Sequence, residues 1–194
     1  MQPTRLTRAD LYSLEEYAEY RAAFRARVMA HKQDRRVPVG PHATLYFEDR
    51  LTMQYQVQEM LRAERIFEAK GIQDELDTYN PLIPDGRNWK ATLMIEYTDA
   101  DERHAALVRL RAIEDRVWVQ AGGDRVYAVA DEDLVRDDAT RTAAVHFLRF
   151  ELTAVLAAAV KAGAAIDIGI DHPHYHHQVQ ATARVRDCLV TDLS

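Results

Sequence analysis

The sequence lacks the residues from which disulfides, metal clusters and long linkers are built. Among 194 residues there is one cysteine, Cys188. A lone cysteine forms no internal disulfide, and an iron–sulfur cluster needs several thiolates. Glycine (7) and proline (6) are scarce, so long disordered linkers are not expected. These shortages exclude a disulfide scaffold and a cluster-carrying electron protein.

The chain also lacks an excess of basic charge and long apolar runs. Its formal net charge is -6 and no basic run occurs, so it is poorly suited to bind a phosphate backbone. The longest apolar run is AVLAAAV at 154–160, far short of the roughly 20 residues that span a bilayer. The first residues, MQPTRLTRADLY, contain no apolar signal-peptide core. We therefore expect a cytoplasmic protein with no nucleic-acid or membrane partner.

Helical and strand patterns alternate along the chain. Helices are predicted at about 14–31, after the capping box Ser13-Leu-Glu-Glu16, at 51–70, at 72–78, at about 98–113, from Thr153 to Gly163 and over TARVRDCLV. Strands are predicted for ATLYFED, WKATLMIEY, RVWVQA, RVYAVAD, AAVHFLRFEL and AAIDIGID, with AGGD as a hairpin turn. The expected fold is α+β: a single domain over residues 1–194, with a mixed or mainly antiparallel sheet of about six strands packed with about five helices.

Four of the eight histidines lie within six positions of the segment IDIGIDHPHYHHQVQ, residues 166–180. If the strand from Ile166 continues, His172 lies on the face of Ile168 and Ile170, and His174 and His176 follow. A His-x-His pair on a strand could provide two ligands of a zinc or iron ion. Pro173 disfavours a regular strand. A metal site, acid–base chemistry and a solvated turn with packed histidines all remain open.

The predicted helix 51–70 carries polar groups almost all round. Its apolar stripe, Met53, Val57, Met60 and Phe67, includes Glu64, and a carboxylate on an inward stripe is costly unless it is paired. Either the helix crosses a polar interior cavity or it packs against another subunit, so a homo-oligomer is an open alternative. The simpler alternative is a structural ion pair between Glu64 and an arginine.

Histidines and acids on distant strands could form one site. His42 and Glu48 alternate onto one face of the strand after Pro41, and His146 shares a face with Leu148 and Phe150. Together with His172 they could converge into a histidine–carboxylate site for zinc or non-haem iron. For His146 alone, a hydrogen-bonded core residue is the simpler interpretation. The chain has no phosphate loop or nucleophile elbow, and its two serines, Ser13 and Ser194, have no catalytic setting.

Seven segments taken in order resemble one known family: SLEEY, GPHATLYFEDR, QVQEMLRAERI, YNPLIPDG, IEDRVWVQ, AVHFLRFEL and DHPHYHHQV. It is the bacterial family catalogued as domain of unknown function three thousand five hundred and one, and the resemblance covers residues 5–192. Genes of this family commonly lie beside a rubrerythrin-like di-iron protein and an iron–sulfur, heterodisulfide-reductase-like oxidoreductase. The resemblance therefore implies redox or peroxide-stress work with those two proteins as partners.

The family patterns also imply site residues. They favour His172 and His177 over the two middle histidines, although Gln178 stands where the family has an acidic residue. With the residues considered above, the metal candidates are His42, Glu48, His146, His172 and His177. The catalytic candidates are Glu64, Arg62 and Tyr175.

Three functions are consistent with the sequence. The first is an accessory or partner protein of the redox system, with or without its own His/carboxylate metal site. The second is a small non-haem iron or zinc enzyme in which a carboxylate acts as base or tunes the metal. The third is a structural or small-molecule-binding protein without catalysis. We favour the first, because it rests on the family resemblance.

Overall fold

The nine strands in the described parts of the chain form two antiparallel sheets. The structure, a computed structural model, describes residues 5–130 and 141–194. The first sheet has the order β1-β2-β3-β7-β6, with bounds Arg36–Pro38, Ala43–Glu48, Asn88–Ile95, Val145–Glu151 and Val129–Ala130. The second has the order β5-β4-β8-β9, with bounds Asp124–Tyr127, Val117–Ala121, Asp167–His172 and Tyr175–Gln180. The α+β class is confirmed, but the strands form two sheets where one was expected.

The chain changes sheet at Ala128. Tyr127 pairs with Trp118 in the second sheet, whereas Val129 pairs with Arg149 in the first. The buried Ala128 donates its backbone N–H to Val117 O at 2.8 Å. The predicted strand RVYAVAD is therefore divided between two sheets, and Asp131 at its end lies outside the described residues.

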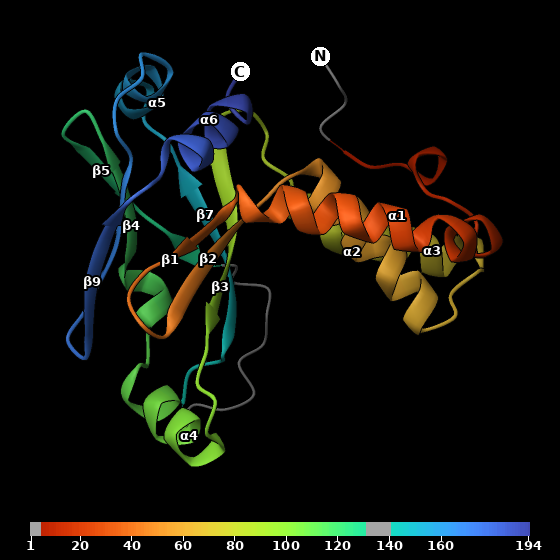
Figure 1. The fold of residues 1–194 in the computed structure, drawn as a ribbon, viewed down its shortest axis with the longest axis horizontal. Coiled ribbons are helices and arrows are strands. Elements are labelled where there is room, and N and C mark those ends of the chain that lie inside the picture. Colours follow the sequence, from red (N-terminus) through yellow and green to blue (C-terminus); the bar gives the residue numbers. More distant parts are fainter. Residues whose placement is uncertain (1–4, 131–140) are drawn as a thin grey trace.

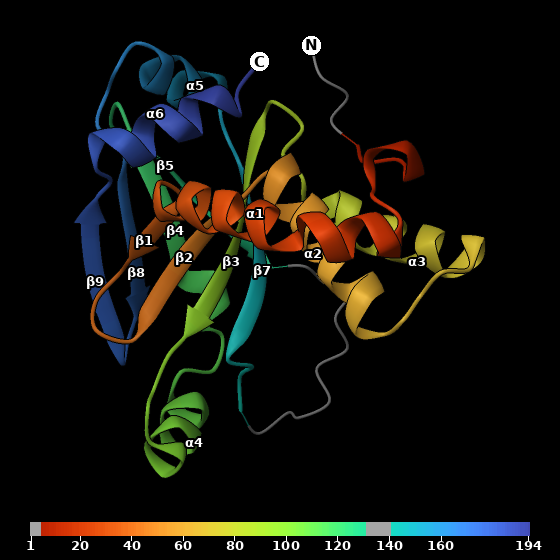
Figure 2. The same cartoon turned by 45° about the vertical axis from the view of Figure 1, so that its right-hand side comes forward.

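The main core lies between the inner faces of the two sheets. Leu45, Leu93 and Phe150 of the first sheet pack in one cluster with Val119 and Ile168 of the second. The cluster is completed by apolar side chains of α5 (Ala154–Lys161) and α6 (Ala183–Thr191). Figures 1 and 2 show both helices together beside one end of the sheets, with α4 (Ala100–Arg109) at the other end.

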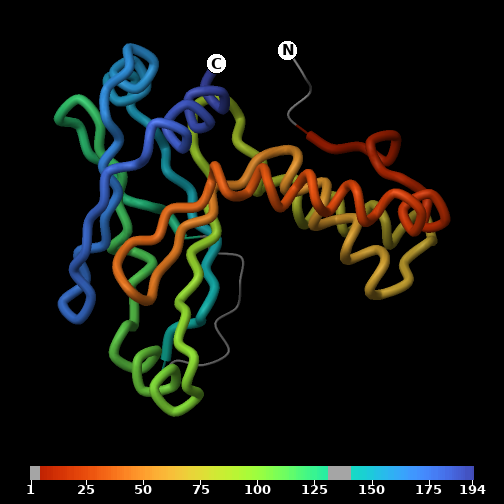
Figure 3. Tube along the Cα trace, in the orientation of Figure 1, coloured from red at the N-terminus to blue at the C-terminus, as the bar shows by residue number. Residues whose placement is uncertain are grey.

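Helices α1 (Leu14–Gln33), α2 (Arg50–Ala63) and α3 (Ala69–Tyr79) extend from the first sheet as a helical arm, seen to the right of the sheets in Figures 1 and 3. The predicted capping box at Ser13 is confirmed. Short 3-10 helices are found at Arg8–Asp10, Asn80–Leu82 and Ile113–Arg116. Within the described parts of the chain, no helix is both long and apolar enough to cross a membrane.

Helix α2 ends earlier than predicted. The N–H of Ile66 bonds to Leu61 O at 2.9 Å, and Arg65 has φ +56°, the arrangement of a Schellman helix end. The prediction of a helix at 51–70 is therefore confirmed up to Ala63 and wrong about its end, because Gly71 lies inside α3. Arg65 carries no signal for such an end, because glycine is the residue that usually adopts this left-handed conformation.

The polar side chains of α2 are used within the chain. The buried Gln58 accepts a hydrogen bond from the Tyr12 N–H at 2.6 Å, and Gln54 donates to Asp10 O at 2.6 Å. Glu59 accepts hydrogen bonds from the Tyr17 hydroxyl at 2.6 Å and from Arg21 at 2.7 and 2.8 Å. The polar surface of this helix thus holds the N-terminal segment and α1 in place.

The left-handed conformation of Arg65 at the end of α2 should reduce the stability of the fold. Arg65→Gly should raise the free energy of unfolding by about 0.5–1 kcal/mol, because glycine removes the left-handed strain but adds freedom to the unfolded chain. Urea denaturation would measure this change. Arg65→Ala is the matched control and should give no comparable gain, since alanine keeps the strain; equal gains from both variants would contradict the assignment.

Candidate functional site

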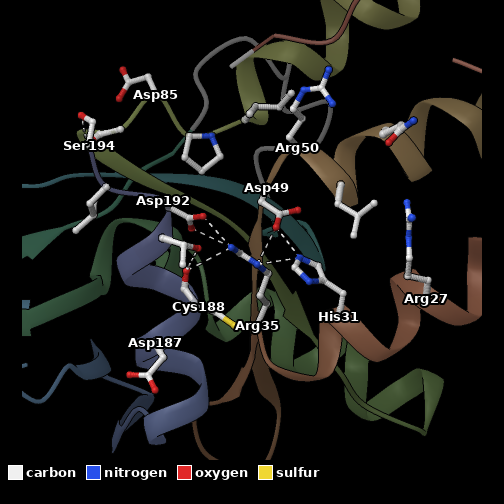
Figure 4. Close-up of a pocket in the computed structure, with 17 residues that line it drawn as sticks. Arg27, His31, Arg35, Asp49, Arg50, Asp85, Asp187, Cys188, Asp192 and Ser194 are labelled. Carbon is white, nitrogen blue, oxygen red and sulfur yellow. Dashed lines mark hydrogen bonds and ion pairs between the residues drawn. The ribbon is translucent and has the colours of Figure 1, made fainter. Parts of the chain in front are cut away.

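The most deeply buried cation in the described residues, Arg35, lies between two carboxylates. It is 2% exposed, and a charge tolerates such burial only when it is paired. Its Nη1 and Nη2 donate to Asp192 Oδ2 and Oδ1 at 2.9 and 2.7 Å, and its Nε lies 2.9 Å from Asp49 Oδ2 (Figure 4). The guanidinium is thus paired on two sides.

These ion pairs join segments that are distant in sequence. Arg35 follows α1, Asp49 is the N-cap of α2 and accepts from the Thr52 N–H at 2.9 Å, and Asp192 is the C-cap of α6. Sequence reasoning missed Arg35. The available signal was strand alternation, because Arg35, Val37 and Val39 are all buried on one face while Arg36 and Pro38 are exposed.

His31, in the last turn of α1, joins Arg35, Asp49 and Asp192 in a cluster of four side chains. Its Nε2 lies 2.5 Å from Asp49 Oδ2, and the two side chains are 29% and 15% exposed. Burial by itself would raise the pKa of Asp49. The His31 hydrogen bond, the Arg35 charge and the Thr52 N–H outweigh burial and hold this pKa below its usual value. The ionised carboxylate therefore holds the imidazole of His31 in one orientation at the end of α1.

The cluster forms one wall of a cleft of about 940 Å³. Arg27 and Arg50 line it on the side of α1 and α2, and Asp85 and Asp187 line it on the opposite side (Figure 4). Arg50 pairs with Asp10 at 2.6 Å. The cleft thus presents charges of opposite sign on two walls.

Cys188 also lines this cleft. Burial raises the pKa of its thiol above the usual value, and the nearby Arg35 charge does not reverse this. The thiol is therefore protonated at neutral pH and is a weak nucleophile there. The charged side chains that line the cleft therefore suit it to ionic binding.

Among the predicted metal ligands, His42 and His177 both contact Tyr175. The His42 N–H donates to the Tyr175 hydroxyl at 2.9 Å, and that hydroxyl donates to Val39 O at 2.7 Å. The ring of His177 lies 4.6 Å from the ring of Tyr175, and the ring of His42 stacks on Tyr97 at 3.9 Å. Burial raises the pKa of Tyr175, so its hydroxyl anchors the loop before β2 as a neutral group.

The other three predicted ligands lie on separate surfaces. Glu48 is on the outer face of the first sheet, whereas His146 pairs in register with Leu93 on its inner, core face. His172 lies at the end of β8 in the second sheet. Opposite faces of one sheet cannot supply ligands to a single ion.

His146 and His172 have local hydrogen-bond partners. His146 Nε2 lies 2.9 Å from Ala143 O and 3.0 Å from Thr142 Oγ1. His172 Nε2 donates to Arg111 O at 3.0 Å, and its Nδ1 accepts from the His174 N–H at 3.2 Å. In residues 5–130 and 141–194, no three His, Cys, Asp or Glu side chains are placed to hold a metal ion. Metal binding by the predicted set stays a prediction.

The catalytic candidates are placed as follows. Glu64 and Arg62 are exposed at the end of α2. The expectation that Glu64 faces inward is wrong, because the helix ends before it.

Pro173 breaks the strand as expected, and it forms a two-residue hairpin turn with His174, so that His172 pairs with Tyr175. The strand β9 after this turn was not predicted.

Comparisons with known proteins identify relatives but no activity. A family model described as "Protein of unknown function (DUF3501)" matches residues 5–193. No curated protein matches the chain. A crystal structure of a protein of unknown function from Burkholderia pseudomallei K96243 is 52% identical and superposes with a TM-score of 0.93, covering 97% of this chain and 99% of that chain.

Removing the buried cation should destabilise the fold strongly. Arg35→Met leaves Asp49 and Asp192 close together without their shared counter-charge, and we expect a loss of about 3–5 kcal/mol in the free energy of unfolding. Denaturant unfolding would measure it. Arg36→Met, at the exposed neighbouring position, should cost less than about 1 kcal/mol. Similar losses in both variants would show that the ion pairs contribute little.

The lowered pKa of Asp49 predicts a pH dependence. Its folded pKa lies below its usual 3.8, so the ionised form stabilises the fold above about pH 4, and this contribution is lost as pH falls through the folded pKa. The stability difference between wild type and Asp49→Asn should therefore shrink between about pH 6 and about pH 3. Urea titrations at several pH values test this, and a constant difference would contradict it.

Proposed function

This chain belongs to the DUF3501 family of proteins of unknown function, and we propose that it is an accessory protein of a bacterial redox and peroxide-stress system. It binds a partner protein at the cleft around Arg35. The partners are those that the family resemblance implies, an iron–sulfur oxidoreductase and a rubrerythrin-like protein. The chain positions its partners, and the electrons pass between the partners' own cofactors.

The observation that carries this proposal is the buried ion network behind the cleft. Arg35, Asp49 and Asp192 join three separate segments, so the walls of the cleft are held in place before anything binds. A preorganised surface loses little conformational freedom on association. Arg27 on one wall and Asp187 on the other offer charges of both signs, and such a pattern selects a partner by electrostatic complementarity.

An accessory role also agrees with the composition. A chain with one cysteine cannot hold an iron–sulfur cluster by itself, and burial raises the pKa of the Cys188 thiol, which disfavours thiolate chemistry. The metalloenzyme alternative draws on some of the predicted histidines and carboxylates, and Glu48, His146 and His172 of that set lie on different faces and sheets. Geometry therefore favours binding over a metal centre built from that set.

The proposal is tested by co-expression with the two partners from the same organism. The wild-type chain should co-purify with at least one of them and bind it at micromolar concentration. Arg27→Glu and Asp187→Lys reverse charges on the two walls of the cleft, and each should weaken binding at least about tenfold, which is about 1.4 kcal/mol. Higher salt should weaken the wild-type complex in the same direction.

The matched control is Arg103→Glu. Arg103 is an exposed arginine on α4, at the end of the sheets away from α5 and α6, and its reversal changes the net charge as Arg27→Glu does. It should leave binding unchanged. Absence of a complex at micromolar concentration would refute the partner role, and equal weakening by Arg103→Glu would refute the cleft as the binding surface.

A further inference from the structure

A second cavity lies against the outer face of the first sheet, the face turned away from the main core. This face carries Tyr46 and Glu48 of β2, Thr92 and Met94 of β3, and Phe147 of β7. The strand register places Tyr46 beside Thr92 and Thr92 beside Phe147. The cavity has a volume of about 290 Å³ and is also lined by residues of α1, α2 and α3 and by Leu82. It is separate from the cleft around Arg35.

The interior of this cavity is buried and its rim is open. Glu48, Met53 and Leu82 are 5%, 3% and 8% exposed. Lys32 and Gln56 are half-buried, and Val145 is 41% exposed. A small molecule entering at the rim would therefore reach Glu48 across apolar side chains.

Only one of the two carboxylate oxygens of Glu48 has a hydrogen-bond donor among the described residues. Its Oε1 accepts a hydrogen bond from the Thr92 hydroxyl at 2.7 Å. Its Oε2 is buried and has no hydrogen-bond partner among the residues that the structure describes. A buried carboxylate oxygen without a donor is costly to the fold. Such a cost is tolerated at sites where a ligand provides the missing donor.

The walls indicate what kind of donor fits. Met53, Met94, Leu82 and Phe147 provide thioether and apolar surface, and the rings of Tyr46 and Tyr79 lie in the same lining. Aromatic faces attract ammonium groups. A divalent metal would instead require several oxygen or nitrogen ligands around it, and Glu48 is the only carboxylate among the described residues of this lining.

We propose that this cavity binds a small primary ammonium compound with an apolar chain, whose ammonium group donates to Glu48 Oε2. The volume lies at the lower end of the range of ligand pockets, about 300 Å³ and upward, so the ligand is the size of a branched alkylamine or an apolar amino acid. An amino acid would add a carboxylate within the same lining as Lys32. The site does not depend on partner binding at the cleft.

Isothermal titration calorimetry of the full-length protein with isoamylamine tests the proposal. We expect saturable binding of isoamylamine and at least tenfold weaker binding of isoamyl alcohol, which has the same chain without the charge. Leucine distinguishes the two sources of the ammonium group: tighter binding than isoamylamine assigns the site to amino acids, and weaker binding assigns it to simple amines. Either result supports the shared ammonium chemistry.

Two variants test the placement of the ligand. Glu48→Gln keeps the size of the side chain but removes its charge, and it should weaken isoamylamine binding at least tenfold. The exposed Glu15→Gln on α1 is the matched control and should bind as the wild type does. Val145→Trp keeps Glu48 and fills the rim from an exposed position, so it should also weaken binding if the cavity is the site.

No saturable binding of isoamylamine at millimolar concentration would overturn the proposal, as would equal binding of the alcohol. Unchanged affinity in both Glu48→Gln and Val145→Trp would place the ligand elsewhere and would also overturn it. If Glu48→Gln fails to fold, Val145→Trp decides the question. Partner co-purification is a separate readout, so failure here leaves the accessory role standing.

Discussion

The need to neutralise a buried guanidinium governs how the parts of this protein fit together. Water is excluded from Arg35, so its charge must be matched by carboxylates placed within hydrogen-bonding distance. The two that match it belong to the start of α2 and the end of α6. The helical arm, the first strand and the C-terminal helix are therefore held in one arrangement, and the cleft between them has defined walls. His31 shares the Asp49 carboxylate, so its orientation depends on the same interaction.

The alternation of side chains along the strands decides which groups can act together. In the first sheet, Leu45, Leu93 and Phe150 face the core, and Glu48 faces the side covered by the helical arm. A histidine such as His146, on the core face, cannot reach Glu48 however the side chains turn. The outer face has a mixture of polar and apolar residues because it forms the floor of a cavity and not the centre of the core. The inner face of the first sheet therefore packs in the core, and its outer face lines the cavity.

The groups best known for nucleophilic chemistry are poorly placed for it in this protein. The Cys188 thiol has a raised pKa and the Tyr175 hydroxyl is committed to the loop before β2. The cleft also presents charged side chains on opposite walls. The similar protein from Burkholderia pseudomallei K96243 is also of unknown function, so the likeness establishes a shared fold and adds no activity to it.

Much of the secondary structure was determined by the sequence itself, because caps, turns and alternation are local. Ser13 with Glu16, Thr153 before α5 and the Gly-Gly turn between β4 and β5 all act within a few residues. Only the tertiary structure decided the rest. The change of sheet at Ala128 depends on β4 and β7, which pair with the residues before and after it. The end of α2 has an arginine in the left-handed conformation where glycine is the usual signal. The candidate site depends on tertiary contacts most of all: Arg35 and Asp192 are 157 positions apart, and no local pattern can indicate that such a pair meets.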